Sequence, residues 1–231
     1  MLAGLCLFLQ STGALFSGPL PEFLSPQARR AVPGSASQLI VAAAERPGRR
    51  DVRLYLLERV ADAWRVASGP HAATIGYKGY APPGAKREGD GRSPSGIFPA
   101  GFAFGYAPSE RVRTRLEYRQ VTGIHFWDTD PNSPRYNQWI AGRAPPGAHE
   151  RMRRRDRQYS LGLVIEYNMR PVVPGLGSAI FLHIWRGPGK PTAGCIGVTE
   201  TRMRWILDWL DPARRPMIMM GTEAVIRSGA F

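Results

Sequence analysis

Short apolar segments, separated by connections rich in glycine and proline, recur along the chain from about residue 38. Their length and their β-branched and aromatic content are typical of strands. The segments are Gln38–Ala42, Val52–Leu57, Trp64–Ser68, Ala72–Gly76, Leu161–Tyr167 and Ala179–Trp185. Gly69–Pro70 is expected to form the turn between the third and the fourth. Such segments at short intervals predict a mainly β domain, and the 26 glycines and 21 prolines agree with many turns.

The last of these segments divides its side chains between two faces, because a strand repeats every two residues. One face is expected to hold Ile180, Leu182 and Ile184, and the other Phe181, His183 and Trp185. The sequence therefore predicts a histidine near the end of a strand, on the face opposite an aliphatic row.

One amphipathic helix is expected late in the chain. Apolar residues follow the i, i+3, i+4, i+7 spacing of a helix face at Met203, Ile206, Leu207 and Leu210. Thr199 is a suitable residue to cap the start of this helix, and Asp211–Pro212 should end it.

The first 37 residues are expected to form a leader and a linker, followed by one domain over residues 38–231. Residues 1–10 are apolar, with the length of a signal-peptide core, and they are too short for a standard transmembrane helix. No lysine or arginine precedes them, so the basic start of a typical signal peptide is missing. Residues 17–37 are rich in proline, serine and alanine, which is typical of a linker. We expect export to the periplasm or the cell envelope.

The chain has a formal charge of +13, and only three of its 31 basic residues are lysines. Such a surface attracts polyanions, and composition does not choose among nucleic acid, anionic lipid and acidic wall polymers. The densest basic stretch, residues 151–157, has no interleaved aromatic residue, and the chain has no nucleic-acid-binding signature. We therefore expect no nucleic-acid partner, interpret the stretch as a solvated face, and keep anionic cell-envelope polymers as candidate partners.

Cysteine occurs twice, at Cys6 and Cys195. Removal of a leader would also remove Cys6, so that Cys195 would have no partner for an intrachain disulfide. A lone thiol in an exported protein is a candidate reactive group, although a lone cysteine is more often a small buried apolar residue.

A histidine stands twelve positions before this cysteine, and a loop rich in glycine and proline separates them. A loop of that length can return to bring the His183 imidazole to the Cys195 thiol. A free thiol has a pKa of about 8.5, and a neighbouring imidazole favours the nucleophilic thiolate. Gly194 lets the backbone approach closely, so the amides of Gly194 and Cys195 are candidates for stabilising an oxyanion.

His183 followed by Thr192-Ala-Gly-Cys195 resembles the catalytic motif of the YkuD-like L,D-transpeptidases, with Thr-Ala-Gly-Cys in place of Ser-His-Gly-Cys. Further segments resemble the family in the same order along the chain. They are Lys86–Phe98 with its Pro-x-Gly-x-Phe element, Phe104–Gly105, Tyr136–Asn137 and Tyr167–Asn168. The resemblance extends from about Leu39 to Val198.

The resemblance implies a β-sandwich or barrel-like fold and an acyl transfer in two steps. No cofactor is expected, and no metal site is expected because no cluster of histidine and cysteine has the spacing of metal ligands. Cys195 would attack the carbonyl of the third residue of a peptidoglycan stem peptide, often meso-diaminopimelate, and release the terminal D-alanine. The acyl group would then pass to an amine of a neighbouring stem. His183 would be the base, oriented by a backbone carbonyl such as that of Ile184. Substrate contacts are expected from Thr192, Ile184, Tyr136, Asn137 and His125, in a protein expected to be a monomer.

Two departures from the family pattern affect the expected reaction. Ala193 stands where the motif has histidine, and Gly197 stands where many members have arginine. Acceptor choice is therefore open, and hydrolysis of the acyl-enzyme, as in a carboxypeptidase or peptidase, is an alternative to transfer.

Two other functions compete with this one. A sortase-like cysteine transpeptidase would use His125, Cys195 and a later arginine such as Arg202. A noncatalytic wall-binding module would leave Cys195 as inert packing.

Overall fold

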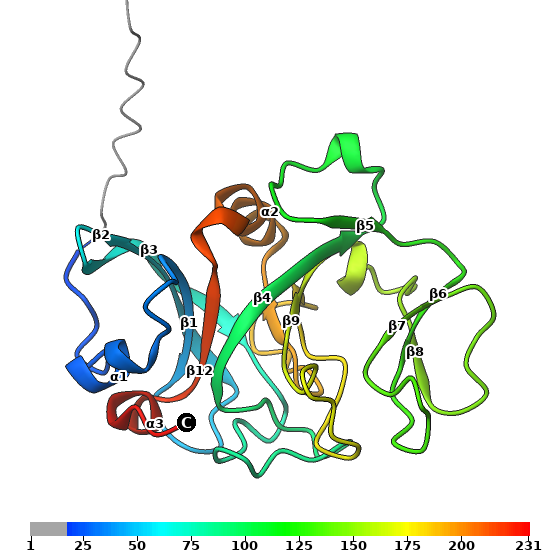
Figure 1. Ribbon diagram of the computed structural model, residues 1–231, viewed down its shortest axis with the longest axis horizontal. Helices are drawn as coiled ribbons and strands as arrows, with labels where there is room; N and C mark the ends of the chain where they lie inside the picture. Colours follow the sequence, from blue (N-terminus) through cyan, green and yellow to red (C-terminus); the bar gives the residue numbers. More distant parts are fainter. Residues whose placement is uncertain (1–17) are drawn as a thin grey trace, which may run out of the picture.

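The computed structural model describes residues 18–231, and strands form most of its regular structure (Figure 1). The strands are β1 (Gln38–Ala44), β2 (Asp51–Val60), β3 (Ala63–Thr74), β4 (Gly96–Gly105), β5 (Tyr118–Gln120), β6 (His125–Asp128), β7 (Trp139–Ala141), β8 (His149–Arg151), β9 (Leu161–Ile165), β10 (Phe181–Ile184), β11 (Ile196–Val198) and β12 (Met217–Thr222). The helices are α1 (Pro26–Ala31), α2 (Glu200–Trp209) and α3 (Glu223–Ser228), with short 3-10 turns at Ser109–Arg111, Gln158–Ser160 and Pro212–Arg214. Strands hold 35% of the described residues and helices 14%, which confirms the mainly β prediction.

The large sheet closes on itself. Its strand order is β12-β1-β2-β3-β11-β10-β9-β4-β5, and β12 also pairs with β4. The pairing of β12 is parallel with β1 and antiparallel with β4. A single residue pair, Gly197 with Thr74, joins β11 to β3. The result is a barrel-like ring with a packed interior.

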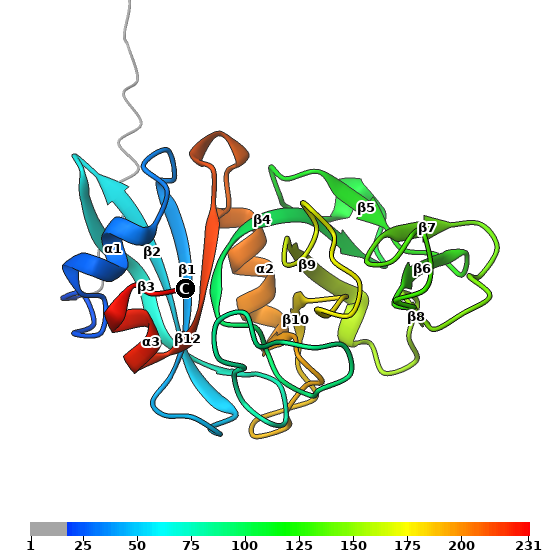
Figure 2. The same cartoon turned by 60° about the horizontal axis from the view of Figure 1, so that its bottom comes forward.

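The helix α2 covers one end of the ring and packs its apolar face against the core inside it (Figures 1 and 2). Met203, Ile206 and Leu207 of this helix are fully buried, and they belong to the same core cluster as Leu182 of β10. The Thr199 side chain caps the start of α2, because it accepts a hydrogen bond from the backbone N–H of Arg202 in the first turn. The predicted helix and its cap are therefore confirmed.

A second core cluster covers the outer face of β1, β2 and β12, beneath α1 and α3. Phe23, Leu24, Ala28 and Val32 contribute to it and are almost completely buried. Much of the expected linker thus packs on the sheet, through Ala28 of α1 and through apolar side chains on both sides of that helix. The expected leader lies outside the described residues, and the domain boundary at residue 38 stays a prediction.

A third cluster covers the outer face of β4, β9 and β10. Phe104, Val164 and Phe181 point outward from these strands, and Trp127 and Tyr159 pack against them from the segment between β5 and β9. That segment includes the small sheet β7-β6-β8, which stands at the end of the molecule opposite α1 and α3 (Figures 1 and 2). The outer face of β10 therefore packs against a separate apolar layer.

The expected turn at Gly69–Pro70 is wrong, since both residues lie inside β3. The pairing of β2 with β3 shifts register beside them, between Leu54 and Leu57. Gly69 has φ +127°, and a Cβ there would lie 2.9 Å from the Leu54 carbonyl oxygen. The glycine thus serves a close approach between two strands, which a sequence pattern does not distinguish from a turn.

Across residues 18–231, the structure contains no helix with the length and apolar character needed to span a membrane.

The Asn137 side chain joins three distant segments of the chain. Its oxygen accepts hydrogen bonds from the indole N–H of Trp127 at 2.9 Å and from the amide of Ala179 at 3.1 Å. Its nitrogen donates to the carbonyl oxygens of Tyr167 at 3.0 Å and Asn168 at 2.7 Å. Asn137 is 1% exposed, so water cannot replace these bonds.

We expect the Asn137→Ala substitution to lower the free energy of unfolding by about 3 kcal/mol, because buried donors and acceptors lose their partners. Urea denaturation followed by fluorescence measures the change. The matched control is Asn132→Ala, an exposed asparagine whose loss should cost less than about 0.5 kcal/mol. Equal effects of the two substitutions would contradict the bridging role of Asn137.

Candidate active site

The parallel pairing of β10 and β11 determines where the candidate nucleophile and base stand. Leu182 pairs with Ile196, and His183 pairs with Gly197. Cys195 directly precedes β11, so its side chain and that of His183 leave the same face of the sheet, two residues apart along the strand direction. Both side chains line the same cavity.

The turn before the cysteine is held from three sides. The Thr192 hydroxyl donates to the Cys195 carbonyl at 2.6 Å and accepts from the Gly194 amide at 3.1 Å. The Ser93 hydroxyl donates to the Gly194 carbonyl at 2.6 Å. A Cβ on Gly194 would lie 3.0 Å from the Arg92 carbonyl oxygen, so glycine permits this close approach. The Gly194 N–H donates to the Thr192 hydroxyl and is therefore not available to donate to an oxyanion.

The Cys195 thiol lies at the base of a cavity and is 7% exposed. Its Sγ accepts a hydrogen bond from the Phe181 amide at 3.4 Å and donates to the Ala179 carbonyl at 3.3 Å. Burial raises the pKa of the thiol to about 12, and the negative charge of Glu150 acts in the same direction. The Phe181 N–H opposes this shift, because it stabilises the thiolate.

The His183 imidazole lines the same cavity and is 3% exposed. Its Nδ1 lies 2.8 Å from the Ile184 carbonyl oxygen, which only accepts. Nδ1 therefore holds the proton of the neutral ring, and Nε2 is left with a free lone pair. Burial lowers the pKa of His183 to about 4, so the pair is a neutral thiol and a neutral imidazole at pH 7.

The cavity has a volume of about 480 Å³, and most of its polar lining comes from two segments besides the β10–β11 connection. Residues that line it include Lys86, Glu88, Glu150, Arg154, Asp156, Gln158, Tyr159, Ser178, Arg186, Thr192, Ala193 and Gly194. Among the sequence-predicted site residues, His183, Cys195, Gly194 and Thr192 meet here.

One wall of the cavity comes from residues 150–159, which include the arginine-rich stretch 151–157. Its arginines are exposed, as expected of a solvated face, except for the partly buried Arg154, which lines the cavity together with Asp156. The Tyr159 ring packs against the His183 ring, with centroids 5.2 Å apart and an interplanar angle of 70°. Its hydroxyl donates to Glu150 Oε2 at 2.5 Å. Arg154 forms two hydrogen bonds with Asp156, at 2.9 and 2.6 Å. No motif identifies these residues, and the only signal in the sequence is Tyr159 beside a run of charges.

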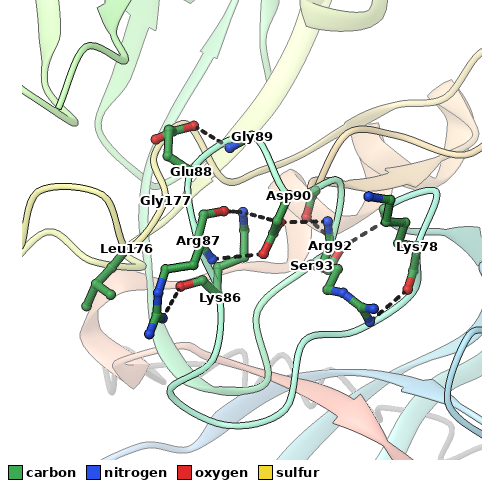
Figure 3. Close-up of polar contacts among 12 residues, drawn as sticks. Lys78, Lys86, Arg87, Glu88, Gly89, Asp90, Arg92, Ser93, Leu176 and Gly177 are labelled. Atoms are coloured by element: carbon green, nitrogen blue, oxygen red, sulfur yellow. Dashed lines mark hydrogen bonds and ion pairs between the residues drawn. The ribbon is translucent and has the colours of Figure 1, made fainter.

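A second wall comes from the loop of residues 84–93, of which Lys86, Glu88 and Gly89 line the cavity. Figure 3 shows the polar contacts within this loop. The Asp90 carboxylate folds this loop, because it accepts hydrogen bonds from the Lys86 ammonium and from the amides of Arg87 and Arg92, as Figure 3 shows. Lys86 is 5% exposed and forms its ion pair with Asp90 at 2.7 Å. This loop thus presents charged side chains, those of Lys86 and Glu88, to the cavity.

Tyr136 and Asn137 do not line this cavity. Tyr136 is 2% exposed, and its hydroxyl donates to Glu88 Oε2 at 2.5 Å, so it supports a wall residue from behind. Asn137 uses its whole amide for the bridge described above. The Ile184 side chain is also outside the lining, and its carbonyl orients His183.

The residues of the sortase-like alternative do not converge on the thiol. His125 is held by Thr122, whose amide donates to its Nδ1 at 2.9 Å, and it does not line the cavity. Arg202 lies on α2 beside Trp205, with one guanidinium nitrogen 3.4 Å from the Ser68 hydroxyl. The structure therefore does not assemble a site from His125, Cys195 and Arg202.

The glycine at position 197 has a packing reason. A Cβ there would lie 2.8 Å from Thr74 Oγ1 and 3.0 Å from Trp185 Cβ. Side chains from both neighbouring strands already fill the space above Gly197, so an arginine at this position would require them to move.

One comparison with known proteins agrees with this geometry. No curated protein and no solved structure matches the chain significantly. The family model YkuD, described as the L,D-transpeptidase catalytic domain, matches residues 40–226. The match includes the barrel-like ring, both walls of the cavity and the cysteine with its histidine. The chain belongs to the L,D-transpeptidase catalytic-domain family, a family of enzymes that act on the peptides of peptidoglycan.

Proposed function

We propose that the chain is an exported cysteine acyltransferase that acts on peptidoglycan stem peptides through a thioester on Cys195. The observation that supports this most directly is the shared cavity, in which Cys195 and the free Nε2 of His183 stand on one face of adjacent parallel strands. An inert packing cysteine would need neither an accessible cavity nor an oriented imidazole.

The first half-reaction begins with a neutral pair. When the substrate carbonyl enters, the thiol proton moves from Sγ to Nε2 of His183, and sulfur forms a bond to the carbonyl carbon. The Ile184 carbonyl then stabilises the imidazolium, because it accepts the hydrogen bond from Nδ1. The carbon–nitrogen bond of the substrate breaks, and the proton passes from Nε2 to the leaving amine of D-alanine. The acyl group remains on Cys195 as a thioester.

The second half-reaction repeats these steps in reverse order. An acceptor amine attacks the thioester carbonyl, its surplus proton passes to His183, and the thiol is regenerated when the sulfur–carbon bond breaks. Water in place of the amine would give hydrolysis and a tripeptide product.

The oxyanion of the tetrahedral intermediate needs a hydrogen-bond donor other than the Gly194 amide. The Gly194 amide donates to Thr192, which leaves the Cys195 amide as the remaining candidate of the two. Thr192 thereby acts as a positioning residue, since its hydroxyl joins the Gly194 amide to the Cys195 carbonyl.

The family acts on the cell wall, and we place this chain in the periplasm or the cell envelope. Its charge of +13 supports an additional attraction to anionic envelope polymers.

Incubation of the purified protein with a stem tetrapeptide should give a covalent acyl adduct on Cys195, detected by intact-protein mass spectrometry. We expect Cys195→Ala to abolish the adduct and to lower turnover by roughly a thousandfold or more, because the nucleophile is gone. Cross-linked dimers among the products would indicate transfer, and tripeptides would indicate hydrolysis.

Two histidine variants provide the matched comparison. His183→Gln should slow acylation by roughly 10²- to 10⁴-fold, the usual contribution of a general base, and His125→Gln should leave the rate unchanged. Unmodified protein and unchanged peptide would favour the noncatalytic wall-binding module. Loss of acylation in His125→Gln alone would favour the sortase-like arrangement.

The free protein should show the pH dependence of an isolated buried thiol. Since the pKa of Cys195 is raised to about 12 and that of His183 is lowered to about 4, the thiolate fraction should increase about tenfold per pH unit from pH 6 to pH 10. The rate of iodoacetamide alkylation, followed by mass spectrometry, measures this slope. A rate that is already constant between pH 5 and pH 8 would instead indicate a preformed thiolate–imidazolium pair.

A further inference from the structure

The carboxylates that line the cavity differ in how fully they are engaged. Asp156 accepts hydrogen bonds from Arg154 and Gln158 on both of its oxygens. Glu88 accepts on Oε2 from Tyr136 and Ser178, and on Oε1 from the Gly89 amide at 3.2 Å.

Glu150 is engaged through one oxygen. Its Oε2 accepts from the Tyr159 hydroxyl at 2.5 Å. Its Oε1 accepts no hydrogen bond from any residue between 18 and 231, and no lysine, arginine or histidine nitrogen in that range lies within 4.0 Å of either oxygen. The neighbouring cation, Arg154, bonds to Asp156 instead. Glu150 is thus a half-buried carboxylate with one oxygen open to the cavity and without a counter-ion.

The position of this carboxylate is fixed beside the reacting groups. Tyr159, which donates to it, is 4% exposed and packs by its ring against His183, Phe104 and Phe181. The negative charge of Glu150 is also the largest charge effect on Cys195, where it raises the thiol pKa after burial itself. The charge of Glu150 therefore affects the ionisation of the Cys195 thiol directly.

A carboxylate that is partly withdrawn from water is less favourable than a fully solvated one unless a cation compensates its charge. The chemistry of the open oxygen restricts which cation fits. A guanidinium group binds best to both oxygens of a carboxylate, whereas a primary ammonium is a compact charge that can bind to one. One oxygen of Glu150 is already taken by Tyr159, so the remaining one suits an ammonium.

We propose that Glu150 receives the ammonium group of the substrate's stem residue, so that the cavity selects peptides with a free amine near the reacting carbonyl. This inference rests on the proposed function for the identity of the peptide, and Glu150 becomes its specificity-determining residue. An ammonium bound here also offsets the negative charge that faces the thiol. Binding of the correct substrate and activation of Cys195 are thereby coupled.

Equilibrium binding tests the inference without turnover. The protein is the full chain with Cys195→Ala, and the probes are two synthetic stem tetrapeptides, one with a free side-chain amine on the third residue and one with that amine acetylated. Isothermal titration calorimetry at pH 8 should show about tenfold tighter binding of the free amine, equivalent to about 1.4 kcal/mol. Adding Glu150→Gln should reduce the ratio to about one, because the amide has no charge.

The matched control is Glu117→Gln, which removes the same charge from an exposed carboxylate that pairs with Arg119 outside the cavity. It should leave the tenfold ratio intact. A ratio that survives Glu150→Gln, or the absence of any preference in the parent protein, would overturn the proposal. Because Cys195 is absent from all of these proteins, failure here is distinguishable from failure of the acyl transfer, which is tested by adduct formation.

A pH series on the parent protein gives a second measurement that needs no change at position 150. Burial raises the pKa of Glu150, with Glu88 and Asp156 acting in the same direction and with Tyr159 and Arg154 opposing. The amine preference should therefore be full above that pKa and disappear as the pH falls through it, while the peptide amine stays protonated. A ratio that does not change down to pH 4 would contradict the role of Glu150.

Discussion

The parallel pairing of β10 with β11 is the constraint on which the site depends. It sets His183 opposite a glycine and places Cys195 two residues before that glycine on the same face. Parallel neighbours require a connection that leaves one strand and returns beside it, and here the loop of residues 185–195 makes this return. Thr192 and Ser93 hold the end of the loop through the backbone of Gly194 and Cys195. A slip of one residue would turn the thiol into the ring interior, because adjacent side chains face opposite sides.

Desolvation dominates the electrostatics of the cavity. Burial alone moves the thiol toward its protonated form and the imidazole toward its neutral form, so the resting site stores no separated charges. The surrounding ions are mostly engaged with one another, as in the pairs Arg154–Asp156 and Lys86–Asp90. The net charge in the cavity therefore changes mainly when a charged substrate binds. The open oxygen of Glu150 is available to bind a cationic group of that substrate.

The sequence predicts the parts of this structure that depend on local pattern. The alternation in residues 179–185 places His183 on the outer face, and the spacing of apolar residues after Thr199 identifies α2. Side chains whose surroundings come from distant segments are not predictable in this way. Tyr136 and Asn137 are polar neighbours in the sequence, yet both are buried as supports, because most of their partners come from distant segments, such as Glu88 and Tyr167. Glu150 and Tyr159 lie in a stretch with the composition of a solvated surface, and only the folded chain brings them to Cys195.

The strand β12 closes the ring, since it pairs with both β1 and β4. During synthesis the ribosome releases these two strands long before residues 217–222. Until then each has an unpaired edge, and such edges are prone to join other chains. The ring therefore stays open while the segments with His183 and Cys195 are made, and it closes only after β12 has left the ribosome. Assembly of the enzyme is a late event that follows release of its final strand.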